Sequence, residues 1–298
     1  MYHNPVLLNE CLDGLNIRPN GTYVDVTFGG GGHSSEILKR LGKDGKLIGF
    51  DQDSDALKND LPDERFRLVH GNFSFVANHL EYLKALPVEG LLADLGVSSH
   101  QFDEASRGFS IRSEGPLDMR MNTAGGESAF EFVNKASKDE LTKVLKEYGE
   151  VGQAGRVVSA ICDKRSKSPI KTTTELVDML GIMVPIKERN GFLAQIFQAI
   201  RIQVNGEMEV LKKLLEQCST VIKPGGRLVV ISYHSLEDRM VKNYIKTGNV
   251  EGVEDKDIFG RSNSPFKALS NKPIVPTEKE LIENNRSRSA KLRIGIKE

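Results

Sequence analysis

Four consecutive glycines, Gly29–Gly32, stand between a run of apolar residues and a stretch with helical spacing. Residues 22–26 predict a strand, and residues 34–41 predict a helix. Glycines in a strand-to-helix turn let the backbone come close to a bound ligand, and open α/β sheets bind nucleotides at such turns. We therefore expect a nucleotide-like ligand here, with Ser34 as the N-cap of the helix. A flexible connector is the alternative, but the regular elements on both sides argue against it.

The spacing of the glycines argues against a dinucleotide. In the pattern G-x-G-x-x-G, Gly29 and Gly31 match, but Ser34 stands where the third glycine belongs. A second predicted strand ends at Asp51, about 20 residues after the glycines, where a carboxylate typically binds ribose hydroxyls. S-adenosylmethionine has a ribose and no pyrophosphate, so the pattern favours this cofactor. An NAD-linked oxidoreductase shares the open sheet and stays the alternative.

Acidic residues recur where predicted strands end. Residues 66–70 and 90–94 predict two more strands, and the second of them ends at Asp94 as the earlier strand ends at Asp51. Repeated β-α units with acids at the strand ends build the shared crevice of an open parallel sheet. Phe73 follows strand 66–70, where an aromatic ring either joins the core or packs on an adenine.

The composition is that of a globular protein without excess charge. Of the 298 residues, 39% are hydrophobic, which is enough to bury a core. Lys plus Arg and Asp plus Glu both number 41, so the formal net charge is +0. A nucleic-acid partner must therefore be argued from local patches of charge.

Cysteines and acids show no metal-binding pattern. The three cysteines lack C-x-x-C spacing, which argues against zinc and against a disulfide framework. The alternating acids at positions 51, 53 and 55 lack the glycine and glutamate that a calcium loop requires further on. The N-terminal residues have no signal-peptide pattern, and no apolar run approaches the length of a bilayer. We therefore predict a cytoplasmic protein with no bound metal and no membrane partner.

The pattern changes from strands to helices in the middle of the chain. Helical spacing predominates from about 104 to 210, where Ser137–Glu140 forms a capping box. A strand pattern returns at residues 227–232. We predict an α/β protein with a mostly parallel, Rossmann-like sheet formed by residues 1–103 and 211–298. An all-helical domain, 104–210, is inserted between these parts.

Seven motifs occur in a fixed order along the chain: TFGGGGHS, DLGVSS, RGFS, GPLDMRM, FQAIRIQVN, PGGRLVVISYHSLEDR and RSRSAKLR. With these motifs the chain resembles the bacterial S-adenosylmethionine-dependent 16S rRNA (cytosine-N4)-methyltransferase family. PGGRL is common among methyltransferases, whereas GPLDMRM together with SYHSLEDR is specific. The resemblance implies a class I methyltransferase fold, S-adenosylmethionine as cofactor, and a helical substrate-recognition domain that agrees with the predicted insertion.

The resemblance also implies which residues bind the cofactor. Gly31, Gly32 and His33 would hold its methionine part, Asp51 its ribose and Phe73 its adenine, while Asp94 and Gln101 would complete the pocket. The chain departs from the family pattern in three places: at Gly30, where a basic residue is often seen, at 149–156 and at 194–196. The last two lie in the insertion, so they concern RNA contacts rather than cofactor binding.

The chemistry of methyl transfer to an amine suggests catalytic candidates. A sulfonium methyl group is already activated, so the enzyme mainly aligns the nucleophile and excludes water. The cytosine amine is a poor nucleophile, and acceptors on its hydrogens would localise its lone pair and receive the leaving proton. We hypothesise that Asp94, Ser98 and Ser99 flank this amine. The alternative is that Asp94 only binds the cofactor and the serines only cap a helix.

Two further groups of residues have two interpretations each. His234 either touches the target base or its phosphate, or is structural; Ser235 is predicted to cap the helix that follows. Arg112, Arg120 and Arg201 either bind the RNA backbone or form ion pairs within the insertion.

The resemblance implies a specific reaction. It is methyl transfer to the N4 amine of a cytidine in the decoding-centre region of 16S rRNA, within the small ribosomal subunit. The alternatives are a DNA amino-methyltransferase and a non-catalytic rRNA-binding assembly factor. A homodimer is left open as the assembly.

Overall fold

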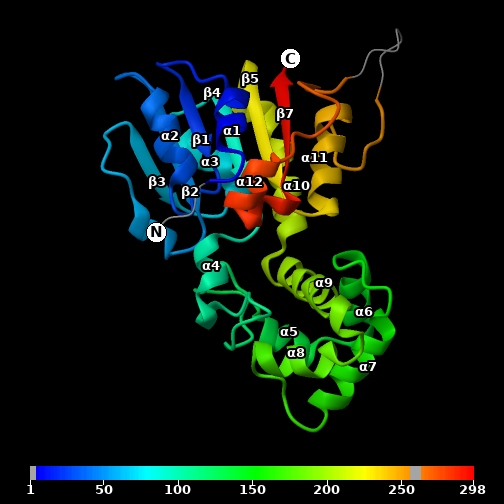
Figure 1. Ribbon diagram of the computed structural model, residues 1–298. Coiled ribbons are helices and arrows are strands. Elements are labelled where there is room, and N and C mark those ends of the chain that lie inside the picture. The colour runs from blue at the N-terminus through cyan, green and yellow to red at the C-terminus, as the bar shows by residue number, and fades with distance from the viewer. Residues whose placement is uncertain (1–4, 256–262) are drawn as a thin grey trace. The chain divides into compact units, whose positions relative to one another are not determined.

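The computed structural model describes residues 5–255 and 263–298 (Figure 1). The chain divides into two compact units. The first unit consists of Met1–Gly96 and Met208–Glu298, and the second consists of Val97–Glu207. The sequence predicts 104–210 for the insertion. Each unit has hydrophobic core residues of its own.

The first unit is built on a seven-stranded sheet with the order β3-β2-β1-β4-β5-β7-β6. The strands are β1 Thr22–Asp25, β2 Lys46–Asp51, β3 Phe66–His70, β4 Val88–Asp94, β5 Ile222–Ser232, β6 Phe266–Ala268 and β7 Lys291–Lys297. Strands β1 to β5 run parallel, whereas β7 is antiparallel to β5 and β6. The chain proceeds from β1 toward β3 in one direction and from β4 toward β5 in the other, so the topological switch point lies between β1 and β4. The predicted Rossmann-like, mostly parallel sheet is confirmed.

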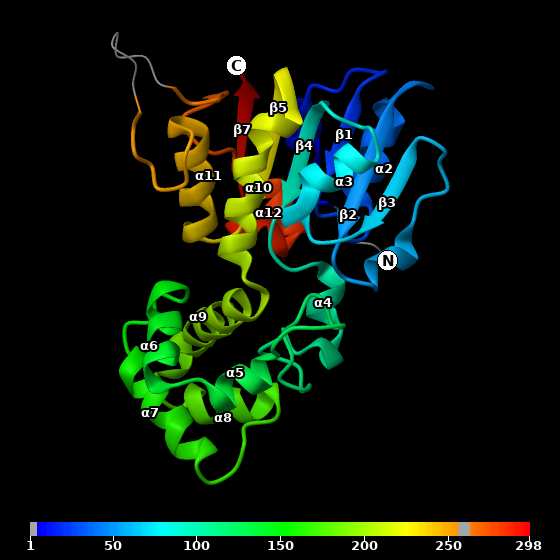
Figure 2. The ribbon, with the colours of Figure 1, turned by 180° about the vertical axis from the view of Figure 1, so that it is seen from behind.

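Helices cover both faces of this sheet (Figures 1 and 2). One face carries α1 Leu8–Leu15 and α2 Gly32–Arg40, and the other carries α3 Val76–Tyr82, α10 Glu207–Val221 and α11 Ser235–Thr247. The remaining short elements are η1 Ala56–Asn59, η2 Phe73–Phe75, α12 Glu278–Glu283 and η4 Asn285–Ser289.

Strand β4 shows how the apolar sequence dictates this layering. Because side chains alternate between the faces of a strand, Leu91 contributes to the core beneath α3, α10 and α11, while Leu92 contributes to the core beneath α1 and α2. Both are fully buried. A strand covered on both faces reads as a continuous apolar run, which is what the residues before Asp94 show.

The second unit is helical and packs around a single core. Its elements are α4 Ser99–Asp103, η3 Ala105–Arg107, α5 Ala129–Lys135, α6 Lys138–Glu147, α7 Ala154–Arg165, α8 Thr173–Gly181 and α9 Ile186–Asn205. The predicted capping box is present, because Ser137 Oγ accepts the Glu140 N–H at 3.2 Å and a Glu140 carboxylate oxygen accepts the Ser137 N–H at 2.8 Å. In the part of the chain that the structure describes, no helix is long and apolar enough to cross a membrane.

Candidate active site

Three carboxyl groups lie at neighbouring strand ends in the first unit. Asp25 ends β1, Asp51 ends β2 and Asp94 ends β4. Strand β1 pairs with β2 on one side and with β4 on the other, so these ends surround the switch point. Ligands of open α/β sheets bind outside these ends. The sequence singles out Asp51 and Asp94 for this place, and the structure adds Asp25.

Asp51 joins the end of β2 to the glycine turn. One of its carboxylate oxygens accepts the Gly29 N–H at 2.8 Å, and the other accepts the Asp53 N–H at 2.8 Å. Burial raises the pKa of Asp51 to about 6, although these two hydrogen bonds act in the opposite direction. A carboxylate has about four acceptor positions, so two remain for hydroxyl groups of a ligand.

The glycine turn has a different physical basis from the one expected. Gly29 and Gly31 have φ of 51° and 74°, in the left-handed region that favours glycine. A Cβ on Gly31 would lie 3.0 Å from the Phe28 ring, and one on Gly32 would lie 2.5 Å from Pro5. Packing inside the protein therefore requires these two glycines, irrespective of any ligand that approaches them.

Ser34 is not the N-cap of α2, contrary to the prediction. Gly31 occupies the N-cap position, and Ser34 lies within the first turn of the helix. The Ser34 hydroxyl donates a 2.7 Å hydrogen bond to Asp25, which also accepts the Thr27 N–H at 3.1 Å. Burial raises the pKa of Asp25, against the effect of nearby His33 and of these hydrogen bonds. A fully buried carboxyl thus anchors both ends of the glycine turn.

Asp94 is held by groups from three other elements. Tyr233, which follows β5, donates a 2.7 Å hydrogen bond from its hydroxyl to Asp94 Oδ1. The Asp94 N–H donates to Thr27 Oγ1 at 2.6 Å, and Asp94 Oδ2 lies 3.9 Å from Nδ1 of His33. Burial raises the pKa of Asp94 to about 6, against the effects of His33 and Tyr233. Sequence reasoning missed Tyr233, whose only local signal is its place directly after a strand.

Phe73 lies just after β3, as the sequence predicts. It begins the short element η2, and its partly buried side chain packs against the core beneath α3. The preceding Asn72 accepts the Ser74 N–H at 2.9 Å and so fixes the start of this turn. Its predicted contact with an adenine stays a prediction.

Ser98, Ser99 and Gln101 belong to the second unit, at the start of α4. Ser98 Oγ accepts the Gln101 N–H at 3.2 Å, and the Gln101 side chain accepts the Ser98 N–H at 3.0 Å. Ser98 therefore caps a helix, which is the alternative that the sequence leaves open. The predicted cofactor contact of Gln101 and the predicted catalytic roles of both serines stay predictions.

His234 caps α11, a position that the sequence assigned to Ser235. The helix begins at Ser235, and His234 Nδ1 accepts the Glu237 N–H at 3.4 Å. Glu237 in turn accepts the Tyr233 N–H at 2.8 Å. The imidazole of His234 is buried, with Nε2 at 3.1 Å from Glu237 Oε1. These contacts give His234 a structural role in the turn after β5, and its contact with a substrate stays a prediction.

Comparison with known proteins shows the family of this chain. The model of the MraW methylase family matches residues 1–298. The chain belongs to the MraW methylase family. The "Ribosomal RNA small subunit methyltransferase H" of Flavobacterium johnsoniae is 54% identical, over 99% of this chain and 98% of that protein. Proteins of the same name from Christiangramia forsetii and Parabacteroides distasonis are 51% and 52% identical, over 99% of this chain and over 98% and 97% of their own lengths.

The cofactor of the MraW methylase family is S-adenosylmethionine, and the class I methyltransferase fold is confirmed. When bound, this cofactor supplies an activated methyl group on a positively charged sulfur. The three acids at the sheet edge fit such a cation. Among the described residues, Asp25, Asp51 and Asp94 form no ion pair with a lysine or arginine, and His33 is the one nearby cationic candidate.

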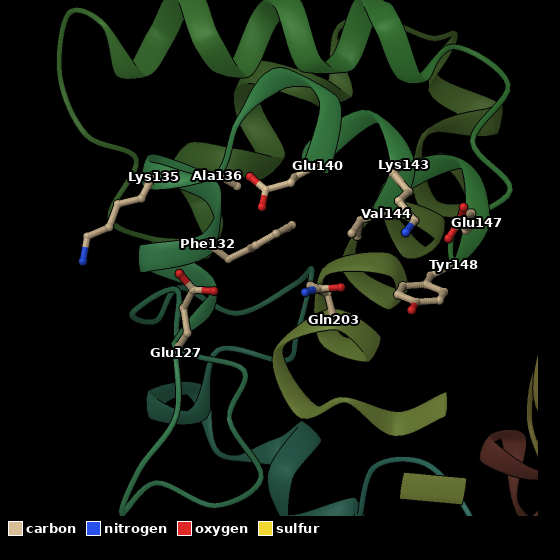
Figure 3. Close-up of a pocket in the computed structure, with 10 residues that line it drawn as sticks. All are labelled: Glu127, Phe132, Lys135, Ala136, Glu140, Lys143, Val144, Glu147, Tyr148 and Gln203. Carbon is tan, nitrogen blue, oxygen red and sulfur yellow. The ribbon is translucent and has the colours of Figure 1, made fainter. Parts of the chain in front are cut away.

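The second unit of this MraW family member carries a separate surface cavity of about 430 Å³ between α5, α6 and α9 (Figure 3). Its floor includes Phe132, Val144 and Tyr148. Its charged lining residues are Glu127, Lys135, Glu140, Lys143 and Glu147. With three acids against two bases, this cavity offers no excess positive charge to RNA phosphates.

Proposed function

We propose that this chain transfers the methyl group of S-adenosylmethionine to the N4 amine of a cytidine in small-subunit ribosomal RNA. The observation that carries the proposal is identity above 50% over nearly the full length to proteins named for methylation of this RNA. The acid edge of the sheet supplies the chemistry that such a reaction needs.

Asp94 is proposed to accept a hydrogen of the attacking amine. The lone pair of a cytosine amine is delocalised into the ring, so an acceptor on the N–H makes the nitrogen a better nucleophile. An acceptor placed here also receives the proton that leaves as the new N–C bond forms. Tyr233 orients the Asp94 carboxyl through Oδ1. Ser98 and Ser99, which follow Asp94 in the chain, keep their predicted role beside the amine.

The proposed cofactor contacts are those predicted from the sequence. The start of α2, at Gly31, Gly32 and His33, would hold the methionine part, and Asp51 would accept the ribose hydroxyls with its two remaining acceptor positions. Phe73 would pack on the adenine. Gln101 would complete the pocket in addition to its role in the capping box.

We propose that the second unit recognises the RNA, with Arg112 as the arginine best placed for a phosphate. Arg120 binds Asp118 through two hydrogen bonds of 2.8 Å, and Arg201 binds Glu207 through two of 2.7 Å. These two arginines therefore form ion pairs within the second unit, which is one of the two interpretations that the sequence allows. Arg112 is exposed to solvent.

We further propose that the reaction takes place in the cytoplasm. Its substrate is a cytidine of the decoding-centre region within the assembled small subunit. A homodimer is an assembly that light scattering can test. The relatives' names support the RNA and leave these finer points to experiment.

Transfer of a radiolabelled methyl group to small subunits from a strain that lacks this protein tests the proposal. We expect label in one cytidine, located by nuclease digestion and mass spectrometry of the rRNA. Free rRNA and double-stranded DNA serve as parallel substrates. Label in DNA alone would make the chain a DNA amino-methyltransferase, and binding of small subunits without label would make it an assembly factor.

A further inference from the structure

His33 and Asp94 face each other across the acid edge of the first unit. His33 is the second residue of α2, and its side chain is only 7% exposed. Its Nδ1 lies 3.9 Å from Asp94 Oδ2. The sequence singles out both residues for cofactor binding, and this pairing is additional to that role.

A backbone carbonyl decides which nitrogen of His33 carries hydrogen. Nε2 lies 3.0 Å from the carbonyl oxygen of Val6, which can only accept. Nε2 is therefore the donor, and in the neutral ring Nδ1 presents a lone pair toward Asp94. An unprotonated Nδ1 opposite an ionised carboxylate places two acceptors face to face. One proton shared by the pair turns this repulsion into attraction.

The two oxygens of Asp94 have different partners. Oδ1 accepts the hydroxyl hydrogen of Tyr233, at 2.7 Å. Oδ2 is the oxygen that faces His33. Within residues 5–255 and 263–298, the base that faces Oδ2 and could receive a proton from it is the Nδ1 of His33.

We propose that His33 is a positioning residue that receives, at Nδ1, the proton which Asp94 takes from the acceptor amine. This inference rests on the proposed function. The amine lone pair forms the N–C bond while the C–S bond breaks and its electron pair stays on sulfur. The N–H proton moves to Asp94 Oδ2 and then to His33 Nδ1, and the Val6 carbonyl stabilises the imidazolium by accepting its Nε2–H.

Charge balance supports this assignment. Methyl transfer turns a positively charged sulfonium into a neutral thioether, so the acid edge loses one positive charge. A proton kept on the His33–Asp94 pair restores that charge until the products leave. Four other titratable groups surround the pair. They are Asp25 of β1, Cys11 of α1, Tyr233 after β5 and Glu237 of α11.

The acidity of Asp94 agrees with a shared proton. Burial raises the pKa of this carboxyl to about 6. This carboxyl therefore holds a proton more readily than an exposed aspartate, whose pKa is about 3.9.

The first test is nitrogen NMR of histidines in the full-length protein without cofactor. We expect His33 to be the Nε2–H form when neutral, and we expect Asp94→Asn to move its titration. An Nδ1–H form, or a titration that Asp94→Asn leaves unchanged, would overturn the inference. This measurement requires no substrate.

The second test compares His33→Gln with His70→Gln. The glutamine amide can retain the N–H donation to Val6 but cannot take up a proton. His70 is the matched control, because its Nε2 also contacts a backbone carbonyl, the oxygen of Gln52 at 3.2 Å. Unlike His33, His70 is exposed to solvent. For His33→Gln, measured at saturating cofactor, we expect kcat to be lower by about tenfold or more and the acid limb of the pH profile to change.

The outcomes separate this inference from the proposed function. If wild type labels small subunits and His33→Gln keeps the wild-type kcat and pH profile, the inference is wrong and the function stands. If wild type labels no RNA, the proposed function fails, and the NMR titration still decides whether His33 and Asp94 share a proton.

Discussion

In the second unit, Asp118 accepts two hydrogen bonds of 2.8 Å from Arg120, whereas in the first unit the partly buried Asp51 and Asp94 have no lysine or arginine partner among the described residues. The pKa values move in opposite directions. Burial raises the pKa of Asp118, but Arg120 outweighs burial and the net shift is downward. Burial dominates at Asp51 and Asp94, whose pKa values rise to about 6.

From this difference we expect that the paired charge stabilises the fold and that the charges without a cation bind a ligand. A paired carboxylate stabilises its own unit, while a buried carboxylate without a cation destabilises the protein until a ligand supplies one. Removing the charge should therefore have opposite consequences in the two regions.

The largest expected effect is that of Asp94→Asn. We expect methyl transfer to fall about a hundredfold or more, because the amide can neither take the amine proton nor pass it on. Rates of label transfer at saturating cofactor measure this effect, with circular dichroism as the control for folding. A rate within a factor of two of wild type would remove Asp94 from the chemistry.

The next effect is that of Asp51→Asn on cofactor binding. Charge-assisted hydrogen bonds to two hydroxyls are lost, so we expect affinity to fall by about 10- to 100-fold. Calorimetric titration with S-adenosylmethionine and with its demethylated product measures the loss. Asp53→Asn is the neighbouring control, because its carboxyl is not assigned to the ribose. Equal losses in both variants would contradict the assignment.

The pH dependence of stability should also differ between the regions. At Asp51 and Asp94 the folded pKa is higher than the unfolded value, so their contribution is fully present below about pH 4 and is lost as the pH rises through about 6. When the pH is lowered from 7 to 5 in the absence of cofactor, we expect protonation of these two groups to increase the free energy of unfolding by about 2 kcal/mol. Urea unfolding of wild type and of an Asp51→Asn, Asp94→Asn double variant at both pH values isolates this contribution. Identical changes in the two proteins would contradict it.

The smallest effect is expected from Asp118→Asn. The pKa of Asp118 is lowered, so its stabilising effect is present above about pH 4 and is lost as the pH falls further. At pH 7 the variant should lose about 1 kcal/mol of unfolding free energy, because the pair is partly exposed. Cofactor affinity should stay unchanged. Thermal unfolding and calorimetry together check this, and a stability gain would break the comparison.

Local pattern was sufficient for the five parallel strands, β1 to β5, and for two of the three acids, but it did not predict the short strand β6. Asp51 and Asp94 could be predicted because each ends an apolar run, and parallel strand ends meet at one edge. Asp25 also ends a strand, but its importance comes from a hydrogen bond with Ser34 that only the folded turn creates. The same bond explains the wrong N-cap prediction, since Asp25 engages the hydroxyl that would otherwise cap the helix.

Other details needed tertiary information for similar reasons. Histidine is an unusual N-cap, so the local rules chose Ser235 over His234. The Tyr233 hydroxyl reaches Asp94 only because β5 pairs with β4. Strands β4 and β5 pair in parallel near the centre of the sheet, although they are far apart in the sequence. The hydrophobic pattern of each strand does not indicate which residues of the two strands lie opposite each other.

That separation has a consequence for how the protein is made. Residues 95–221, including the whole second unit, leave the ribosome after β4 and before β5. During this interval one edge of β4 has no strand to pair with, and its apolar side chains lack the cover that β5 and α11 later provide. The inserted helices, whose contacts are local, can form first. Completion of the crevice therefore waits for the last third of translation, and a nascent chain stalled before β5 would be prone to aggregate.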